Sequence, residues 1–195
     1  MEVSVAHLIY IANTSLDGYI EDMDGKFDWT APDEEYFRFI TNLVREAGTY
    51  LYGRRLYESM MVWETDPKLA AESPLTRDFA EIWQAANKIV YSRTLPAAST
   101  RKTRLERDFD PEAIRQLKDT VEQDILIGGA ELAAHAFRSG LIDECHLFLI
   151  PIIVGGGKPS LPDNVRLELK LLEERRFGSG VVFLRYQVTQ KAMPT

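Results

Sequence analysis

The chain has 195 residues, 45% of them hydrophobic and 27% charged, and carries a net charge of −7 at pH 7. These values are typical of one globular domain over 1–195 and exclude a general binder of nucleic acid or membrane surfaces. A single cysteine, Cys145, and three scattered histidines predict neither a disulfide nor a metal centre. No signal-peptide pattern and no apolar run of membrane-spanning length is present, so we expect a cytoplasmic protein.

The first half of the chain alternates between predicted strands and helices. An apolar run at 4–12 predicts a buried strand, and the long polar connection at 13–32, with two Asp-Gly pairs, predicts turns in a loop of functional length. Residues 33–47 are predicted to form an amphipathic helix with acidic residues in its first turn. The next predicted elements are a strand at 49–52, a helix from 53–60, a helix at 75–86, a strand in 87–95 and an edge strand at 102–107.

The second half ends in strands. A helix is predicted at 111–121, with Asp110 as its cap, and a helix-like segment follows two glycines after the apolar run 125–127. A strand at 146–154 contains Pro151, which predicts a bulge or an edge. A strand at 165–172 with one solvated face and a strand at 181–188 are predicted to form a hairpin. The pattern predicts an α/β fold with a mostly parallel sheet and an antiparallel edge.

The junction of strand and helix at Gly128 and Gly129 is a candidate anion site. A helix N-terminus has unpaired N–H groups and a partial positive charge, and glycine lets a phosphate approach the backbone closely. The junction matches neither the Walker sequence nor G-x-G-x-x-G. Phosphate binding and a simple tight turn are therefore equally good interpretations of this junction alone.

Two other predicted strands end in residues suited to phosphate. Gly53 and Arg54 follow the strand at 49–52, and Ser92, Arg93 and Thr94 follow the strand that begins at 87. Ligands of open α/β sheets bind beyond the carboxyl ends of strands, and guanidinium groups bind phosphate in bidentate fashion. The alternative for each arginine is a solvated surface charge. Together with the glycine junction, these positions favour a phosphorylated dinucleotide such as NADPH.

Six stretches occur in an order and at intervals that resemble a known superfamily: SLDGYI (15–20), DGKFDW (24–29), YGRRLYE (52–58), SRTL (92–95), ILIGGAEL (125–132) and IPIIVGGGKP (150–159). The chain resembles the dihydrofolate reductase-like superfamily over about residues 6–188. The most similar branch contains the C-terminal reductase domain of the bifunctional riboflavin-biosynthesis deaminase/reductase. This resemblance implies a mainly parallel eight-stranded sheet flanked by helices, a C-terminal antiparallel hairpin, NADPH as hydride donor and a homodimer.

The resemblance also implies roles for particular residues. Gly53 and Arg54 would contact the cofactor phosphates, and Ala12 and Asn13 would approach the nicotinamide. The remaining cofactor positions are those expected to bind the adenosine 2′-phosphate, namely Ser92, Arg93 and Thr94, and those expected along the pyrophosphate, namely Gly128, Gly129, Ala130, Glu131 and Leu132. One position departs from the pattern, because Leu56 replaces a threonine whose hydroxyl would help to bind phosphate.

Two carboxylates are candidates to bind the ring of a pyrimidine or pterin substrate. Asp33 lies in the first turn of the helix that follows the Trp29 loop, where dihydrofolate reductases have their ring-binding acid, and its alternative role is to favour the helix dipole. Asp17 matches the aspartate that faces the substrate in riboflavin reductases, and its alternative role is that of a turn residue.

Three functions are compatible with these residues. The first is an NADPH-dependent reductase of a pyrimidine- or pteridine-like small molecule, such as 5-amino-6-(5-phosphoribosylamino)uracil or dihydrofolate. The second is a nucleotide-binding protein of the same fold without catalysis, which the substitution at Leu56 keeps open. The third is a dimeric scaffold in which the apolar strand at 146–154 pairs with a second copy of the chain.

Overall fold

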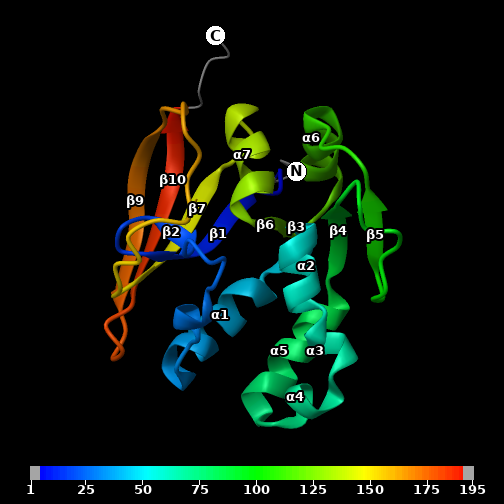
Figure 1. Cartoon of the computed structure of the whole chain (residues 1–195). Helices are drawn as coiled ribbons and strands as arrows, with labels where there is room; N and C mark the ends of the chain where they lie inside the picture. Colours follow the sequence, from blue (N-terminus) through cyan, green and yellow to red (C-terminus); the bar gives the residue numbers. More distant parts are fainter. Residues whose placement is uncertain (1–4, 191–195) are drawn as a thin grey trace.

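The computed structural model describes residues 5–190, which form a mixed sheet with helices on both faces. The strand order is β5-β4-β3-β6-β1-β7-β10-β9, and Figure 1 shows this sheet running from β9 and β10 on the left to β5 on the right. Its strands are β1 (Leu8–Ser15), β3 (Ala47–Gly53), β4 (Asn87–Tyr91), β5 (Thr103–Glu106), β6 (Asp124–Gly128), β7 (Glu144–Ile150), β9 (Glu168–Arg176) and β10 (Val182–Gln190). Neighbours from β5 to β7 pair in parallel, whereas β10 pairs antiparallel with both β7 and β9.

The helices follow the strands closely in sequence. They are α1 (Glu34–Arg45), α2 (Arg54–Met60), α3 (Val62–Thr65), α4 (Pro67–Ala71), α5 (Pro74–Ala85), α6 (Pro111–Thr120) and α7 (Ala130–Arg138), with a 3-10 turn η1 (Asp28–Thr30) before α1. The residues at its own N-terminus determine where α6 begins: the Asp110 side chain accepts from Glu112 N at 2.9 Å, and Pro111 occupies the first turn. None of these helices in the described chain has the length and apolar character that crossing a bilayer would require.

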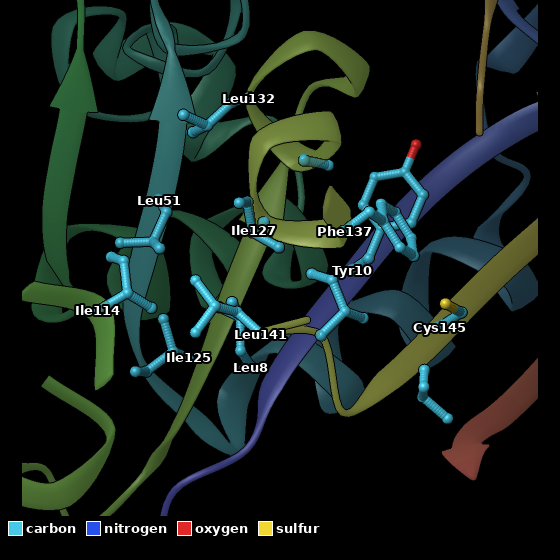
Figure 2. Packing of buried hydrophobic residues seen from close by; sticks show 14 of the residues in the cluster. Leu8, Tyr10, Leu51, Ile114, Ile125, Ile127, Leu132, Phe137, Leu141 and Cys145 are labelled. Atoms are coloured by element: carbon cyan, nitrogen blue, oxygen red, sulfur yellow. The ribbon is translucent and has the colours of Figure 1, made fainter. Parts of the chain in front are cut away.

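The alternation of side chains along the strands produces a core on each face of the sheet. On one face, α6 and α7 cover Leu8, Leu51 and Ile127, and Figure 2 shows these side chains in one cluster with Leu132 and Phe137 of α7. On the other face, α1, α2 and α5 cover the side chains of alternate strand residues such as Tyr50, Tyr52, Val90 and Leu126. The parallel strands are therefore buried on both faces, which explains their nearly continuous apolar runs.

A second, two-stranded sheet lies beside the first. Strand β2 (Tyr19–Glu21) pairs antiparallel with β8 (Lys158–Pro159), and we call this unit the small sheet. Its backbones are very close, because a Cβ on Gly157 would lie 1.9 Å from the carbonyl oxygen of Glu21. The small sheet is fixed to the main one by Tyr10, whose hydroxyl donates to the carbonyl of Ser160.

The predicted α/β class, the eight-stranded mostly parallel sheet and the C-terminal hairpin are confirmed, and β5 lies at the predicted edge. Three strand predictions need correction. The strand predicted at 4–12 is β1, which starts at Leu8 and continues to Ser15, into the predicted polar connection. The strand predicted at 146–154 is β7, which ends at Ile150 because Pro151 cannot donate a ladder hydrogen bond. The strand predicted at 165–172 is β9, which starts at Glu168, and both of its faces are solvent-exposed. Ser4, in the predicted first strand, lies outside the described residues.

The position of β7 also bears on the proposed scaffold. This strand pairs with β1 on one side and with β10 on the other, so its backbone hydrogen-bonding groups are already used within the chain. Edge pairing between two copies through this strand is therefore wrong. The outer strands of the sheet are β5 and β9.

Candidate functional site

A cavity of about 1020 Å³ opens at the carboxyl ends of β1, β3, β4 and β6. This is the edge where open α/β sheets bind ligands. The cavity wall includes most of the positions that the sequence singled out, namely Ala12, Asn13, Gly53, Arg54, Ser92, Arg93, Gly128, Gly129, Ala130, Glu131 and Leu132. Thr94 is not part of the wall but is bonded to it, because Arg54 Nη1 donates to Thr94 Oγ1 at 2.9 Å. The parallel register of four strands brings these separate stretches of sequence together.

The ends of β3 and β4 form a polar corner of the cavity. Besides Thr94, the Arg54 guanidinium also bonds Glu58, from Nε to Oε1 at 2.8 Å. The Ser92 hydroxyl accepts from the backbone N–H of Thr94 and of Leu95, which fixes the turn after β4. Arg93 is exposed and pairs with Asp108, from Nε to Oδ1 at 2.9 Å. The corner thus presents two guanidinium groups and two hydroxyls, a set suited to a phosphate monoester.

The two glycines of the junction between β6 and α7 have different structural reasons. A Cβ on Gly128 would lie 2.5 Å from Cδ2 of Leu56, so glycine at this position makes room for that leucine. Gly129 has φ +89°, a conformation that side-chain-bearing residues rarely adopt, and a Cβ there would meet nothing within 4 Å. Gly129 is also the N-cap residue of α7 and provides no side-chain cap, so the first N–H groups of this helix remain available to an anion.

Leu56 is the position that departs from the family pattern. In the structure its side chain covers Gly128 and packs with the apolar cluster between the sheet and α5. At the position where the resemblance implies a threonine, this chain therefore has apolar packing under the junction. Arg55, the next residue back, lines the same cavity.

Three adjacent rings line the side of the cavity from the end of β4 to α7. The rings of Tyr91 and Phe109 are 5.6 Å apart, and Phe109 is stacked on His135 at 5.8 Å with an interplanar angle of 28°. All three line the cavity. His135 thus packs against Phe109 while its ring also faces the cavity. Phe109 was not singled out from the sequence, because it lies beyond an edge strand where no motif marks it.

At the end of β1, a buried tyrosine orients an amide toward the cavity. The Tyr36 hydroxyl bonds Oδ1 of Asn13, and burial raises the pKa of Tyr36, so this hydroxyl keeps its proton and acts as the donor. An amide whose oxygen is used in this way has its Nδ2 hydrogens left as donors. Asn13 lines the cavity, so its amide is a candidate hydrogen-bond donor to a ligand there.

Neither predicted carboxylate lines the cavity. Asp33 caps α1, where its side chain accepts from Tyr36 N at 2.8 Å, and this hydrogen bond is the main reason why its pKa is lowered. Asp17 accepts from the backbone N–H of Val154 and Gly155 at 3.1 and 2.8 Å. The pKa of Asp17 is also lowered, first by the Ser15 hydroxyl and then by these N–H groups. Asp33 is thus the N-cap of α1, one residue before the predicted first-turn position, and the geometry of Asp17 matches its alternative role of a turn residue.

Four charged residues also line the cavity: Glu21, Arg55, Lys158 and Glu131. Ion pairs connect them across three elements. Their sequence separations are too long for local periodicity to reveal the pairs. Among all the residues that the structure describes, no group of three or more His, Cys, Asp or Glu side chains is arranged to bind a metal ion.

The sheet order and the cavity at its carboxyl edge define an α/β protein of the dihydrofolate reductase-like fold. The family model for the RibD C-terminal domain matches residues 6–183, and the chain belongs to this family. Among curated proteins, it is 34% identical to uncharacterized protein YyaP of Bacillus subtilis (strain 168) over 178 residues, which cover 88% of this chain and 89% of YyaP.

Solved structures support the same fold. A putative riboflavin biosynthesis protein from Shewanella sp. PV-4 superposes with a TM-score of 0.73 at 21% identity, covering 94% of this chain and 99% of that one. A pyrimidine reductase-like protein from Corynebacterium diphtheriae superposes with a TM-score of 0.63 at 16% identity, covering 96% and 94% of the two chains. At these identities the likeness establishes the fold, and the residues of the cavity must carry any statement about chemistry.

Proposed function

We propose that this protein is an NADPH-dependent reductase of a pyrimidine- or pteridine-like small molecule. The observation that carries the proposal is the single cavity of about 1020 Å³ into which four strand ends bring the glycine junction, the polar corner and Asn13. Its volume matches the upper end of the range for small-molecule and cofactor sites, about 300–1,000 Å³. Membership of the RibD C-terminal domain family supports reductase chemistry.

The residues present fit the cofactor. Ser92, Arg93 and Thr94, with Arg54 bonded to Thr94, would bind the adenosine 2′-phosphate. The first N–H groups of α7 would bind the pyrophosphate, and the missing Cβ of Gly129 leaves open space for it. A Cβ on Gly53 would also meet nothing within 4 Å, so the phosphates can approach the start of α2 closely.

When bound, NADPH supplies the hydride, and the chain supplies position and polarity. Ala12 and Asn13 would lie beside the nicotinamide at the end of β1. The Asn13 amide, oriented by Tyr36, would donate to a carbonyl oxygen of the bound ring system. A donor fixed in advance in this way stabilises negative charge that develops on such an oxygen during hydride transfer.

The proposal is tested by titrating the purified protein with NADPH and with NADH in a calorimeter. We expect micromolar binding of NADPH and much weaker binding of NADH, because only NADPH has the 2′-phosphate that the polar corner would bind. The matched variant is Arg93→Met, which should weaken NADPH and leave the NADH affinity nearly unchanged, because Arg93 is assigned to the 2′-phosphate alone. Equal affinities for the two cofactors would refute the assigned corner, and no binding of either would refute the reductase.

The substrate follows from consumption of NADPH at 340 nm with pteridines and aminouracils, including 5-amino-6-(5-phosphoribosylamino)uracil. The carboxylates Asp17 and Asp33 remain our candidates to bind its ring. One observation favours the second function, a nucleotide-binding protein without catalysis: both carboxylates lie outside the cavity wall and are engaged by backbone N–H groups. Tight NADPH binding with no oxidation across the panel would favour that second function.

We also propose that the protein is a homodimer. The support within the chain is the solvent-exposed outer strand β9, on which Leu169, Leu171 and Leu172 are 42–44% exposed. Light scattering coupled to size exclusion gives the mass in solution directly. A mass of about 44 kDa, twice the 22.2 kDa of the chain, is expected, and a mass of one chain would refute the dimer.

A further inference from the structure

Four side chains of alternating charge form a row along the cavity wall. Arg55 of α2 bonds Glu21 of β2, from Nη1 to Oε1 at 3.0 Å. The Lys158 ammonium of β8 lies 3.3 Å from the same Glu21 oxygen and 2.7 Å from Oε1 of Glu131 in the first turn of α7. This ion row connects α2 to the start of α7 through the small sheet. It ends at the junction where the pyrophosphate of the proposed cofactor would lie.

The two ends of the last ion pair differ in their surroundings. The Lys158 side chain is 24% exposed, and its strand is fixed against β2 by the close approach of Gly157 to Glu21. The Glu131 side chain is 81% exposed. Lys158 is thus the fixed partner, whereas the Glu131 carboxylate can turn into solvent without losing packing.

The charge at this junction is balanced within the chain. The hydrogen bond from Lys158, followed by the charges of Lys158 and Arg55, lowers the pKa of Glu131, which is therefore a carboxylate at neutral pH. A carboxylate beside the first turn of a helix favours the helix dipole. The same carboxylate repels an incoming phosphate. The Glu131 carboxylate therefore lies at the start of α7, where a negatively charged phosphate would also bind.

We propose that Lys158 is a ligand of the cofactor pyrophosphate and that Glu131 is its internal substitute. The inference rests on the proposed function. When the pyrophosphate reaches the start of α7, the Lys158 ammonium exchanges the Glu131 carboxylate for a phosphate oxygen, and Glu131 turns toward solvent. Lys158 also bonds Glu21, so the small sheet keeps its position over the cavity while the exchange takes place.

The ion pair can be broken from either end, and the two ends give opposite results. Lys158→Met removes a charge-assisted hydrogen bond to the pyrophosphate, so we expect NADPH affinity to fall by about 10- to 100-fold. Glu131→Gln removes the competing carboxylate and leaves the lysine in place, so we expect affinity to rise by roughly 2- to 10-fold. Lys158→Arg should retain most of the affinity, because the positive charge remains.

Adenosine 2′-monophosphate is the matched probe, since it contains the 2′-phosphate but no pyrophosphate. Its affinity should be the same in the wild type and in all three variants. Thermal unfolding of each variant confirms that the fold is intact before the titrations are compared.

The outcomes separate the possible explanations. A fall with Lys158→Met and a rise with Glu131→Gln supports the exchange. A shift of both variants in the same direction means that the pair only ties β8 to α7, and it overturns the inference while leaving the proposed function in place. An unchanged NADPH affinity in Lys158→Met overturns it as well. If neither NADPH nor adenosine 2′-monophosphate binds to the wild type, the proposed function and the inference fail together.

Discussion

The adjacent glycines at the start of α7 give a sharp test, because they are required for different reasons. In Gly128→Ala the new Cβ would lie 2.5 Å from Cδ2 of Leu56, well inside the 3.5–4.0 Å at which two carbons pack, so the leucine must rotate away. Overpacking of this kind costs about 1–3 kcal/mol. In Gly129→Ala the new Cβ meets nothing within 4 Å, but alanine must adopt φ +89°. Backbone strain of that kind also costs about 1–3 kcal/mol.

Leu56→Ala distinguishes the two causes. By itself this change removes three carbons of a half-buried side chain and should destabilise the protein by about 1–2 kcal/mol. It also removes the atom that the Gly128→Ala methyl would strike, so the double variant should be more stable than the sum of the single effects by about 1–2 kcal/mol. Combined with Gly129→Ala, the same change should be additive, because no side chain is involved there.

The measurement is the free energy of unfolding in urea for the wild type, the three single variants and the two double variants. A coupling energy between positions 56 and 128, together with additivity between 56 and 129, would confirm the assignment. Additivity in both pairs would refute it and would mean that Gly128 is required by the backbone as well. A neutral Gly128→Ala variant would show that Leu56 rotates freely, and the close contact would then have no structural consequence.

Three further predictions concern stability. Asp33→Ala should lower the melting temperature through loss of the α1 cap, and Asp33→Asn should restore most of it, because asparagine caps equally well. Burial lowers the pKa of Lys88 to about 8, so the unfolded chain binds more protons above that pH, and stability should rise from pH 8 to 10 more steeply in the wild type than in Lys88→Met. Burial raises the pKa of Glu144, but hydrogen bonds from His146 and Arg185 outweigh it and lower this pKa to about 2. The unfolded chain therefore binds more protons than the folded one in acid, so the free energy of unfolding should fall from pH 5 toward pH 2, and it should fall less in Arg185→Met. Urea unfolding at the stated pH values tests both pH effects, and identical slopes in wild type and variant would contradict them.

The elements that the sequence predicts correctly are those set by neighbours in the chain. Asp110 and Pro111 start α6 by themselves, since a cap needs only the first turn of its own helix. The apolar run before Gly128 predicts β6, because a parallel strand is buried on both faces. The strand-end rule then collects Gly53, Arg54 and Ser92 at one edge without any knowledge of the strand order.

The errors arise where distant segments decide. The apolar run at 146–154 continues past Pro151, but the strand does not, since proline has no N–H to donate to a neighbouring strand. The alternation at 165–172 predicts a strand with one covered face, whereas β9 is the outer strand and side chains on both of its faces are solvent-exposed. Asp33 and Asp17 show the same limit for the site. Each lies at the expected position in the sequence, but its carboxylate accepts hydrogen bonds from backbone N–H groups. For Asp33 the donor is three residues away, and for Asp17 it is more than 130 residues away.

The charges of the cavity have a common feature that the sequence does not show. Arg54 bonds Glu58, Arg93 bonds Asp108 and Lys158 bonds Glu131, so each cation assigned to a phosphate already has a carboxylate partner. These pairs hold the cations in place, which lowers the entropic cost of ordering them around a ligand. They also mean that a phosphate gains only the difference between its own bond and the one it displaces. Removing one of these carboxylates should therefore strengthen NADPH binding, whereas removing its cation should weaken it.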